Sequence, residues 1–142
     1  MKKYVLARFL RIVGNCVKNG IPLASSFTTV GEVMDNTVYK MACNRIEEKI
    51  IRGENLALAL SQEGKELFPK IIIRMVKGAE KTGTVDEAML RLSDFYENEV
   101  DRDLKRFTTL IEPVMIVFLG ILVGSIAISV IAPIYQMTSK IK

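Results

Sequence analysis

The residues with the most obvious chemical potential lie at positions 78–84, which read Gly-Ala-Glu-Lys-Thr-Gly-Thr. A lysine, a hydroxyl and two glycines are the components of a phosphate-binding P-loop, whose backbone N–H groups surround the phosphates. In a P-loop the Lys-Thr pair follows the second glycine, whereas Lys81-Thr82 precedes Gly83, and no strand pattern leads into the stretch. The sequence therefore does not predict a nucleotide site here.

Other catalytic patterns are missing as well. The sequence contains no histidine, so the commonest general base and metal ligand is absent. Cys16 and Cys43 each stand alone in a helical pattern and are interpreted as small core residues. The formal net charge of +4 is too small to indicate a nucleic-acid partner. We predict a protein that is not an enzyme and needs no metal or cofactor.

Charged residues do form a pattern. Lys70, Arg74, Lys77 and Lys81 follow steps of four, three and four, which places them on one stripe of a helix. The next segment is acidic, with Asp86, Glu87, Asp94, Glu97, Glu99 and Asp101 against Arg91. Two interpretations stay open. The stripe is either a solvated face with cross-helix ion pairs of about 0.2–1 kcal/mol each, or a docking surface for a partner protein, where charge sets orientation and association rate.

Apolar residues recur at helical spacing along nearly the whole chain and predict an all-α fold, a six-helix antiparallel bundle followed by one transmembrane helix. Glycine stops, prolines and caps bound the first five helices. The first expected helix covers residues 5–18 and ends at Gly20, and a short second helix has Pro22 in its first turn. The third covers residues 36–52, with Asn36 as its cap and Gly53 at its end. Asn55 caps a fourth helix at 55–60, and the fifth runs from Phe68-Pro69 to Lys81.

The next turn has the most specific pattern. Gly83 is expected to end one helix in the left-handed conformation. Thr84 and Glu87 are spaced as a capping box, in which each side chain binds the other residue's backbone N–H. We therefore expect the sixth helix to begin at Val85 and to run through Arg106, with a kink at Pro113.

An uncharged stretch of 27 residues, 113–139, follows. As a helix, residues 113–132 would rise about 30 Å, which matches the hydrocarbon thickness of a bilayer. Gly120 and Gly124 form a G-x-x-x-G motif, extended by Ser125, that favours close packing against another helix, although such motifs also arise by chance. We predict a helical domain at 1–110, a transmembrane helix at 111–135 that contains Pro113 and Pro133, and a short tail at 136–142.

Several motifs in this order resemble one family. They are Ala7-Arg8-Phe9, Gly20-Ile21-Pro22-Leu23, the run at 53–60 (Gly-Glu-Asn-Leu-Ala-Leu-Ala-Leu), Phe68-Pro69, the run at 78–83, Phe95-Tyr96-Glu97, Glu112-Pro113 and Pro133-Ile134-Tyr135. Together they are similar to the F-type platform proteins of type II secretion and type IV pilus assembly, over nearly the whole chain.

This resemblance implies a bacterial inner-membrane platform whose helical domain lies in the cytoplasm. The implied partners are the membrane, an assembly ATPase, pilin or pseudopilin subunits, other inner-membrane assembly proteins and a second copy of the chain. Members carry two such domains and three spans, and this chain corresponds to the second domain and the last span. A membrane-tethered structural or signalling adaptor unrelated to fibres remains the alternative.

The family's glutamate and glycine before the sixth helix correspond to Glu80 and Gly83. For Gly83 we expect a backbone role. For Glu80 we expect a hydrogen bond that orients the turn, with a contact to a partner as the alternative. The basic stripe Lys70, Arg74, Lys77 and Lys81 would then receive the ATPase.

Overall fold

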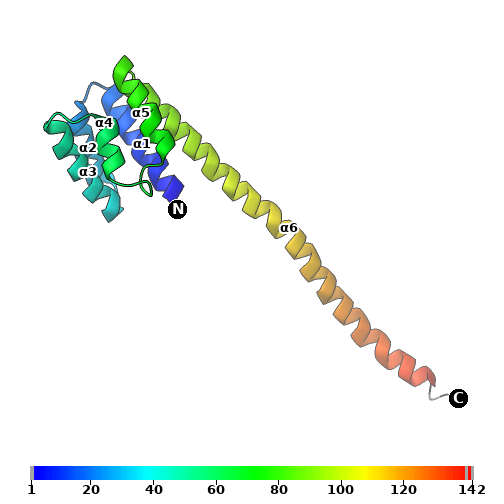
Figure 1. Cartoon of the computed structure of the whole chain (residues 1–142). Coiled ribbons are helices and arrows are strands. Elements are labelled where there is room, and N and C mark those ends of the chain that lie inside the picture. The colour runs from blue at the N-terminus through cyan, green and yellow to red at the C-terminus, as the bar shows by residue number, and fades with distance from the viewer. Residues whose placement is uncertain (1, 140, 142) are drawn as a thin grey trace. The chain divides into compact units, whose positions relative to one another are not determined.

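The computed structural model describes residues 2–139 and 141, and these form six α-helices and no strand (Figure 1). In chain order they are α1 (Lys2–Lys18), α2 (Leu23–Val33), α3 (Thr37–Ile51), α4 (Leu56–Gln62), α5 (Lys70–Thr82) and α6 (Val85–Ser139). The prediction of an all-α chain is confirmed. The chain divides into two compact units, Met1–Val100 and Asp101–Lys142, called here the first and second unit. Lys140 and Lys142 of the predicted tail lie outside the described residues.

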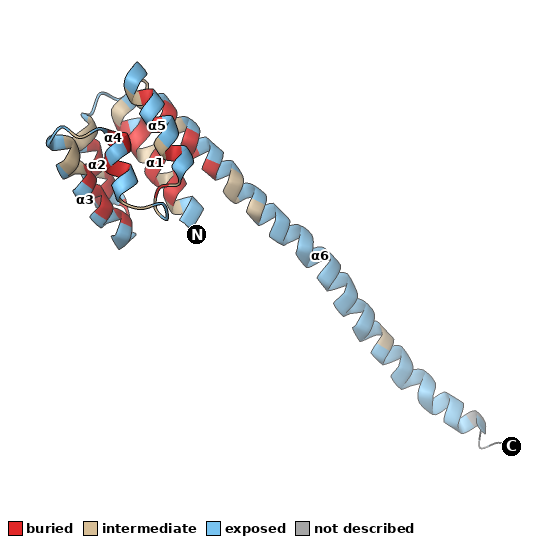
Figure 2. Ribbon diagram, in the orientation of Figure 1, coloured by how far each residue is buried: buried red, intermediate tan, exposed pale blue. Residues whose placement is uncertain are grey.

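The core of the first unit is organised around Phe9, which is completely buried. Its ring centroid lies 5.9 Å from that of Phe27, 5.7 Å from that of Tyr39 and 5.2 Å from that of Phe68. These rings come from α1, α2, α3 and the segment before α5. Tilted aromatic pairs at such distances stabilise a core beyond the effect of their buried area. Phe9 thus joins four segments, and Figure 2 shows the buried residues of α1 to α5 concentrated in this unit.

Helix α1 also packs closely against the start of α6. A Cβ atom on Gly14 would lie 2.9 Å from Leu90 Cγ, so only glycine leaves room for this approach. The buried Ser93 hydroxyl donates a hydrogen bond of 3.0 Å to the Ala7 carbonyl. The close approach at Gly14 and the Ser93 hydrogen bond therefore fix the position of α1 along α6 without any contribution from surface ion pairs.

Both cysteines are buried and free, as predicted. Burial raises the pKa of the Cys43 thiol to about 12, so this thiol stays protonated. Both cysteines therefore contribute to the packing of the core.

The helix ends follow the sequence signals with some differences. Asn36 caps α3, because its side chain accepts hydrogen bonds from the backbone N–H groups of Val38 and Tyr39. Pro22 has φ −53° and ψ 143° and therefore precedes α2 instead of occupying its first turn, and Pro69 precedes α5 in the same way. Helix α1 begins at Lys2, three residues before the predicted start at residue 5.

Helix α6 continues through Pro113 and Pro133. The sixth helix and the expected membrane helix are therefore one element and not two. Proline removes one backbone N–H, but a helix in apolar surroundings tolerates this loss when local adjustments satisfy the freed carbonyl. How much of the second unit lies in a membrane stays a prediction.

Replacement of Phe9 by alanine tests the aromatic core. We expect Phe9→Ala to lower the free energy of unfolding by about 3–5 kcal/mol, because the cavity touches three other rings. Phe95→Ala is the matched control, since the Phe95 side chain is 46% exposed, and should cost about 1 kcal/mol or less. Urea unfolding of the detergent-solubilised chain, followed by circular dichroism, measures both. Equal losses would contradict the central position of Phe9.

Candidate docking surface on helix α5

Helix α5 has one buried side and one basic side. Ile72, Val76 and Ala79 point into the core. The other side carries Lys70, Arg74, Lys77 and Lys81, all of them exposed; these four residues are called the basic face. Within the described part of the chain, none of the four forms an ion pair.

Three acidic residues of α6, namely Asp94, Glu97 and Glu99, pair with α1 and not with α5. The Arg11 guanidinium binds both carboxylate oxygens of Glu97 at 2.7 Å and one oxygen of Asp94 at 2.8 Å. Hydrogen bonds to Glu97 and then to Asp94 raise the pKa of Arg11. Lys3 adds an ion pair to Glu99 at 3.0 Å. The cross-helix pairs that the sequence allowed between α5 and α6 are therefore not formed, and the basic face is left uncompensated.

Glu80 lies on α5 between Lys77 and Lys81 but reaches the beginning of α4. One of its carboxylate oxygens accepts the backbone N–H of Leu56, and the other accepts that of Ala57 at 3.1 Å. A helix N-terminus leaves such N–H groups without partners and favours a negative charge. The expected cap, Asn55, makes no side-chain hydrogen bond there. Glu80 therefore positions α4 against α5, and the expectation that it orients the turn before α6 is wrong.

The turn between α5 and α6 depends on Gly83. Its φ of 70° lies in the left-handed region, where a side chain would be strained. The backbone N–H groups of Gly83 and Thr84 both donate to the Ala79 carbonyl. The predicted capping box is not formed: the Thr84 hydroxyl shares a hydrogen bond of 2.8 Å with that of Thr82, and Glu87 pairs with Arg91 at 3.5 Å. The nearby Thr82 hydroxyl competes for Thr84 in a way that the local pattern does not show.

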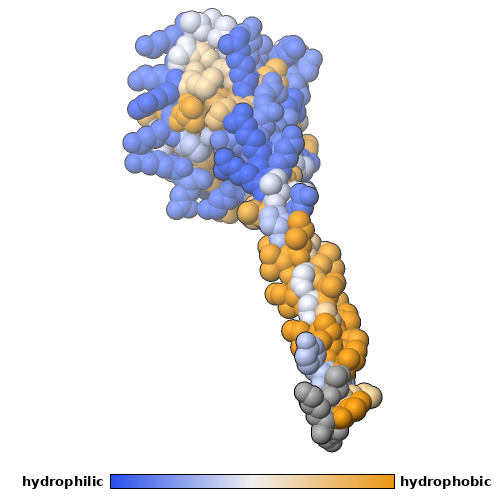
Figure 3. Space-filling view, turned by 90° about the vertical axis from the view of Figure 1, so that its right-hand side faces the viewer, coloured by the Kyte–Doolittle hydropathy of each residue, from blue (hydrophilic) through white to orange (hydrophobic). Residues whose placement is uncertain are grey.

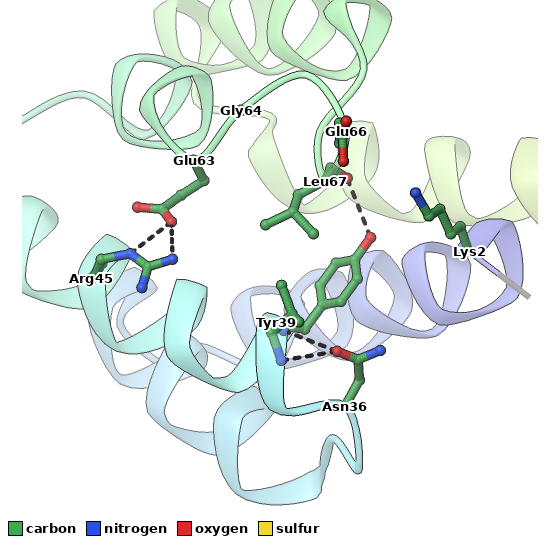
Figure 4. A pocket seen from close by; sticks show the side chains of 9 residues that line it. Lys2, Asn36, Tyr39, Arg45, Glu63, Gly64, Glu66 and Leu67 are labelled. Carbon is green, nitrogen blue, oxygen red and sulfur yellow. Dashed lines mark hydrogen bonds and ion pairs between the residues drawn. The ribbon is translucent and has the colours of Figure 1, made fainter.

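A cavity of about 580 Å³ lies between α3 and the connection from α4 to α5 (Figure 4). The Tyr39 hydroxyl donates to the Leu67 carbonyl at 3.2 Å, and burial raises the pKa of Tyr39 to about 12. Glu63 is bound by Arg45 on the other side of the cavity. Among the described residues no buried side-chain polar atom lacks a partner, and no cluster of possible ligands could hold a metal ion. These contacts stabilise the fold and define no ligand.

The second unit is mostly apolar on its surface (Figure 3). Among the described helices, α6 is long and apolar enough to cross a membrane, and none of its most apolar stretch is buried within the protein. Gly120 and Gly124 have no neighbour within 4 Å of an added Cβ atom. The hydroxyls of Ser125 and Ser129 bind carbonyls of their own helix. The G-x-x-x-G face therefore offers small side chains whose polar atoms are already satisfied.

A family model described as type II secretion system (T2SS), protein F, matches residues 9–133. The chain belongs to this family. It is 31% identical over its whole length to the type IV pilus assembly protein PilC of Myxococcus xanthus, of which it covers 34%. Over 96% of its length it is 32% identical to PilC of Thermus thermophilus, and over 95% it is 29% identical to the type II secretion system protein F of Xanthomonas campestris; it covers 33% of each. The chain thus spans about a third of the length of these curated relatives.

The structure connects two of the motifs that resemble the protein F family. The run at 53–60 contains the start of α4, and the run at 78–83 contains Glu80 and Gly83. The Glu80 carboxylate joins them over 24 residues of sequence. Sequence reasoning identified both motifs but not their contact, because no pattern within one helix encodes it.

Substitution at Glu80 and Asn55 separates the two possible caps. We expect Glu80→Ala to lower the free energy of unfolding by about 1.5–3 kcal/mol, because two N–H donors lose a charged acceptor. Asn55→Ala should cost about 0.5 kcal/mol or less, because its side chain makes no cap bond. Urea unfolding curves of both variants measure the two losses in free energy of unfolding. A larger loss for Asn55→Ala would reverse the assignment.

The contacts of Glu63 predict that the free energy of unfolding depends on pH. Its side chain is 3% exposed and contacts Arg45 at 2.6 Å and Lys49 at 3.0 Å. Burial alone would raise the pKa of the Glu63 carboxyl, but hydrogen bonds from Arg45 and Lys49 outweigh burial and lower it from the ordinary value of 4.5. A lowered pKa in the folded state means that the stabilisation is present above pH 4.5 and is lost as the pH falls through the folded pKa.

Unfolding measured from about pH 7 to about pH 3 should therefore show a loss of stability at the acidic end that is smaller in Glu63→Gln. Glu48→Gln is the control, since the Glu48 side chain is exposed and its carboxylate lies 4.0 Å from the Arg52 guanidinium. An unchanged pH profile in Glu63→Gln would show that its ionisation does not stabilise the fold.

Proposed function

We propose that this chain acts as part of a platform in the bacterial inner (cytoplasmic) membrane, coupling a cytoplasmic assembly ATPase to the movement of pilin or pseudopilin subunits. Membership of the protein F family supports this role, because the relatives are named for type IV pilus assembly and type II secretion. The role is that of a structural adaptor and not of an enzyme.

The two units fit different parts of this role. The first unit would lie in the cytoplasm, and the apolar part of α6 would cross the membrane. The small face formed by Gly120, Gly124 and Ser125 suits close contact with another membrane helix, from a second copy or from another inner-membrane assembly protein.

The observation that carries the docking part is the uncompensated basic face. Acidic residues are available on α6, but Asp94 and Glu97 already pair with Arg11. Four exposed cations on about three turns of one helix therefore attract an acidic partner surface. Within the proposed role, that surface belongs to the assembly ATPase, which would dock on α5 beside the turn at Gly83.

Charge reversal tests this docking. We expect the triple variant Lys70→Glu, Arg74→Glu and Lys77→Glu to reduce co-purification of the assembly ATPase by about tenfold, because attraction becomes repulsion. The measurement uses the membrane-inserted chain extracted in mild detergent, with the ATPase of the same organism.

The matched control is Lys18→Glu, Lys40→Glu and Lys65→Glu, which changes the net charge equally at exposed sites outside the basic face. Circular dichroism establishes that both variants fold. Undiminished ATPase recovery with the folded basic-face variant, or equal losses in both variants, would exclude docking at α5.

A further inference from the structure

A second exposed stripe runs along α5 beside the basic face. Ile71, Met75, Gly78 and Thr82 are each one residue after a member of the basic face, and so follow the same steps of four, three and four about 100° around the helix. Ile71 is 46% exposed and Met75 is 38% exposed. A strip of apolar and small residues thus borders a strip of cations over the length of α5.

This second stripe forms one wall of a groove. A shallow cavity of about 350 Å³ is lined on the α5 side by Arg74, Met75, Gly78, Ala79 and Thr82. Thr84, Glu87, Ala88 and Arg91 line it from the turn and from α6. Glu87 is the one carboxylate in the lining, and it pairs with Arg91. The groove is therefore apolar at its base, with the basic face along one edge.

Gly78 is the informative residue of this groove. It lies inside α5, where glycine is less favourable than alanine, and it is not among the glycines with positive φ. An added Cβ atom would meet nothing within 4 Å. Neither the backbone nor the packing of the first unit requires glycine here. Glycine also allows the close approach of another backbone, and the open space beside Gly78 leaves room for such an approach by another molecule.

We infer that this groove seats an acidic amphipathic helix of the assembly ATPase, with a small or apolar ridge over Gly78 and its carboxylates facing the basic face. The inference rests on the proposed function for the identity of the partner. A helix fits because ridges spaced by three and four residues pack into the groove of a facing helix.

Two other occupants fit less well. A second copy of the first unit offers acidic residues on α6, but Asp94, Glu97 and Glu99 already pair with α1. A lipid surface is bound by helices with bulky apolar faces, whereas this stripe has a glycine and a threonine between Met75 and the turn.

Filling the groove tests the inference. Gly78→Leu places a side chain where the partner helix would lie and should weaken binding of the purified ATPase to the full chain by about tenfold or more. The thermal melting temperature should not fall, because leucine favours the helix and its Cβ atom would meet nothing within 4 Å. Asn98→Leu adds the same side chain at an exposed position of α6 outside the groove and should leave binding within about twofold.

The possible outcomes distinguish a failure of the inference about the groove from a failure of the proposed function. Unchanged binding in Gly78→Leu, together with weaker binding in the basic-face variant, overturns the groove and leaves ATPase docking intact. Loss of self-association in Gly78→Leu, measured by sedimentation, overturns it in favour of a second copy. No binding of the ATPase to the wild-type chain overturns the proposed function.

A synthetic peptide tests, without the ATPase, whether the groove prefers an acidic amphipathic helix. It is an alanine-based peptide of about 20 residues, long enough to be helical, with glutamates at steps of four, three and four, compared with a scrambled peptide of equal charge. Tighter binding of the periodic peptide by about tenfold, lost in Gly78→Leu, supports the inference. Equal binding of the two peptides overturns it.

Discussion

Helix α4 has seven residues, too few to be stable alone, and its position depends on a carboxylate from another helix. Glu80 accepts the N–H groups of Leu56 and Ala57, which would otherwise be unpaired. The contact works in both directions, because the side chain that caps α4 also fixes the rotation of α5. With Glu80 held towards α4, the stripe containing Lys77 and Lys81 faces solvent. The Glu80 contact and the burial of Ile72, Val76 and Ala79 on the core side of α5 therefore agree in leaving the basic face exposed.

The distribution of charge depends in turn on α1. Arg11 binds Asp94 and Glu97 in a fork that a lysine could not reproduce. Each exposed pair contributes little stability, about 0.2–1 kcal/mol, and Ser93 with Gly14 already sets the approach of α1 to α6. The network also occupies Asp94 and Glu97, so these two carboxylates do not neutralise the basic face.

The sequence predicted the parts of this structure in which donor and acceptor lie within one turn. Asn36 caps α3 because its side chain binds N–H groups two and three residues ahead. The same rule failed at Asn55, because the Glu80 carboxylate, 24 residues after Leu56, takes the donors at the start of α4, and at Thr84, because the Thr82 hydroxyl competes. Periodicity likewise predicted the basic stripe but not its lack of partners. Whether a charge is compensated depends on which helices lie next to each other, and this depends on contacts such as Ser93 to Ala7, 86 residues apart.

Gly83 and Gly78, in the turn after α5 and inside α5, differ in whether the fold of the first unit explains the absence of a side chain. Gly83 has a left-handed φ that the chain needs in order to reverse, so its presence is explained within the first unit. Gly78 has no such φ, and nothing lies close to the site of its missing side chain. A mid-helix glycine costs roughly 0.5–1 kcal/mol relative to alanine. No contact of the first unit offsets this cost, and in the docking inferred above the partner helix over Met75 and Gly78 would supply the compensating interaction.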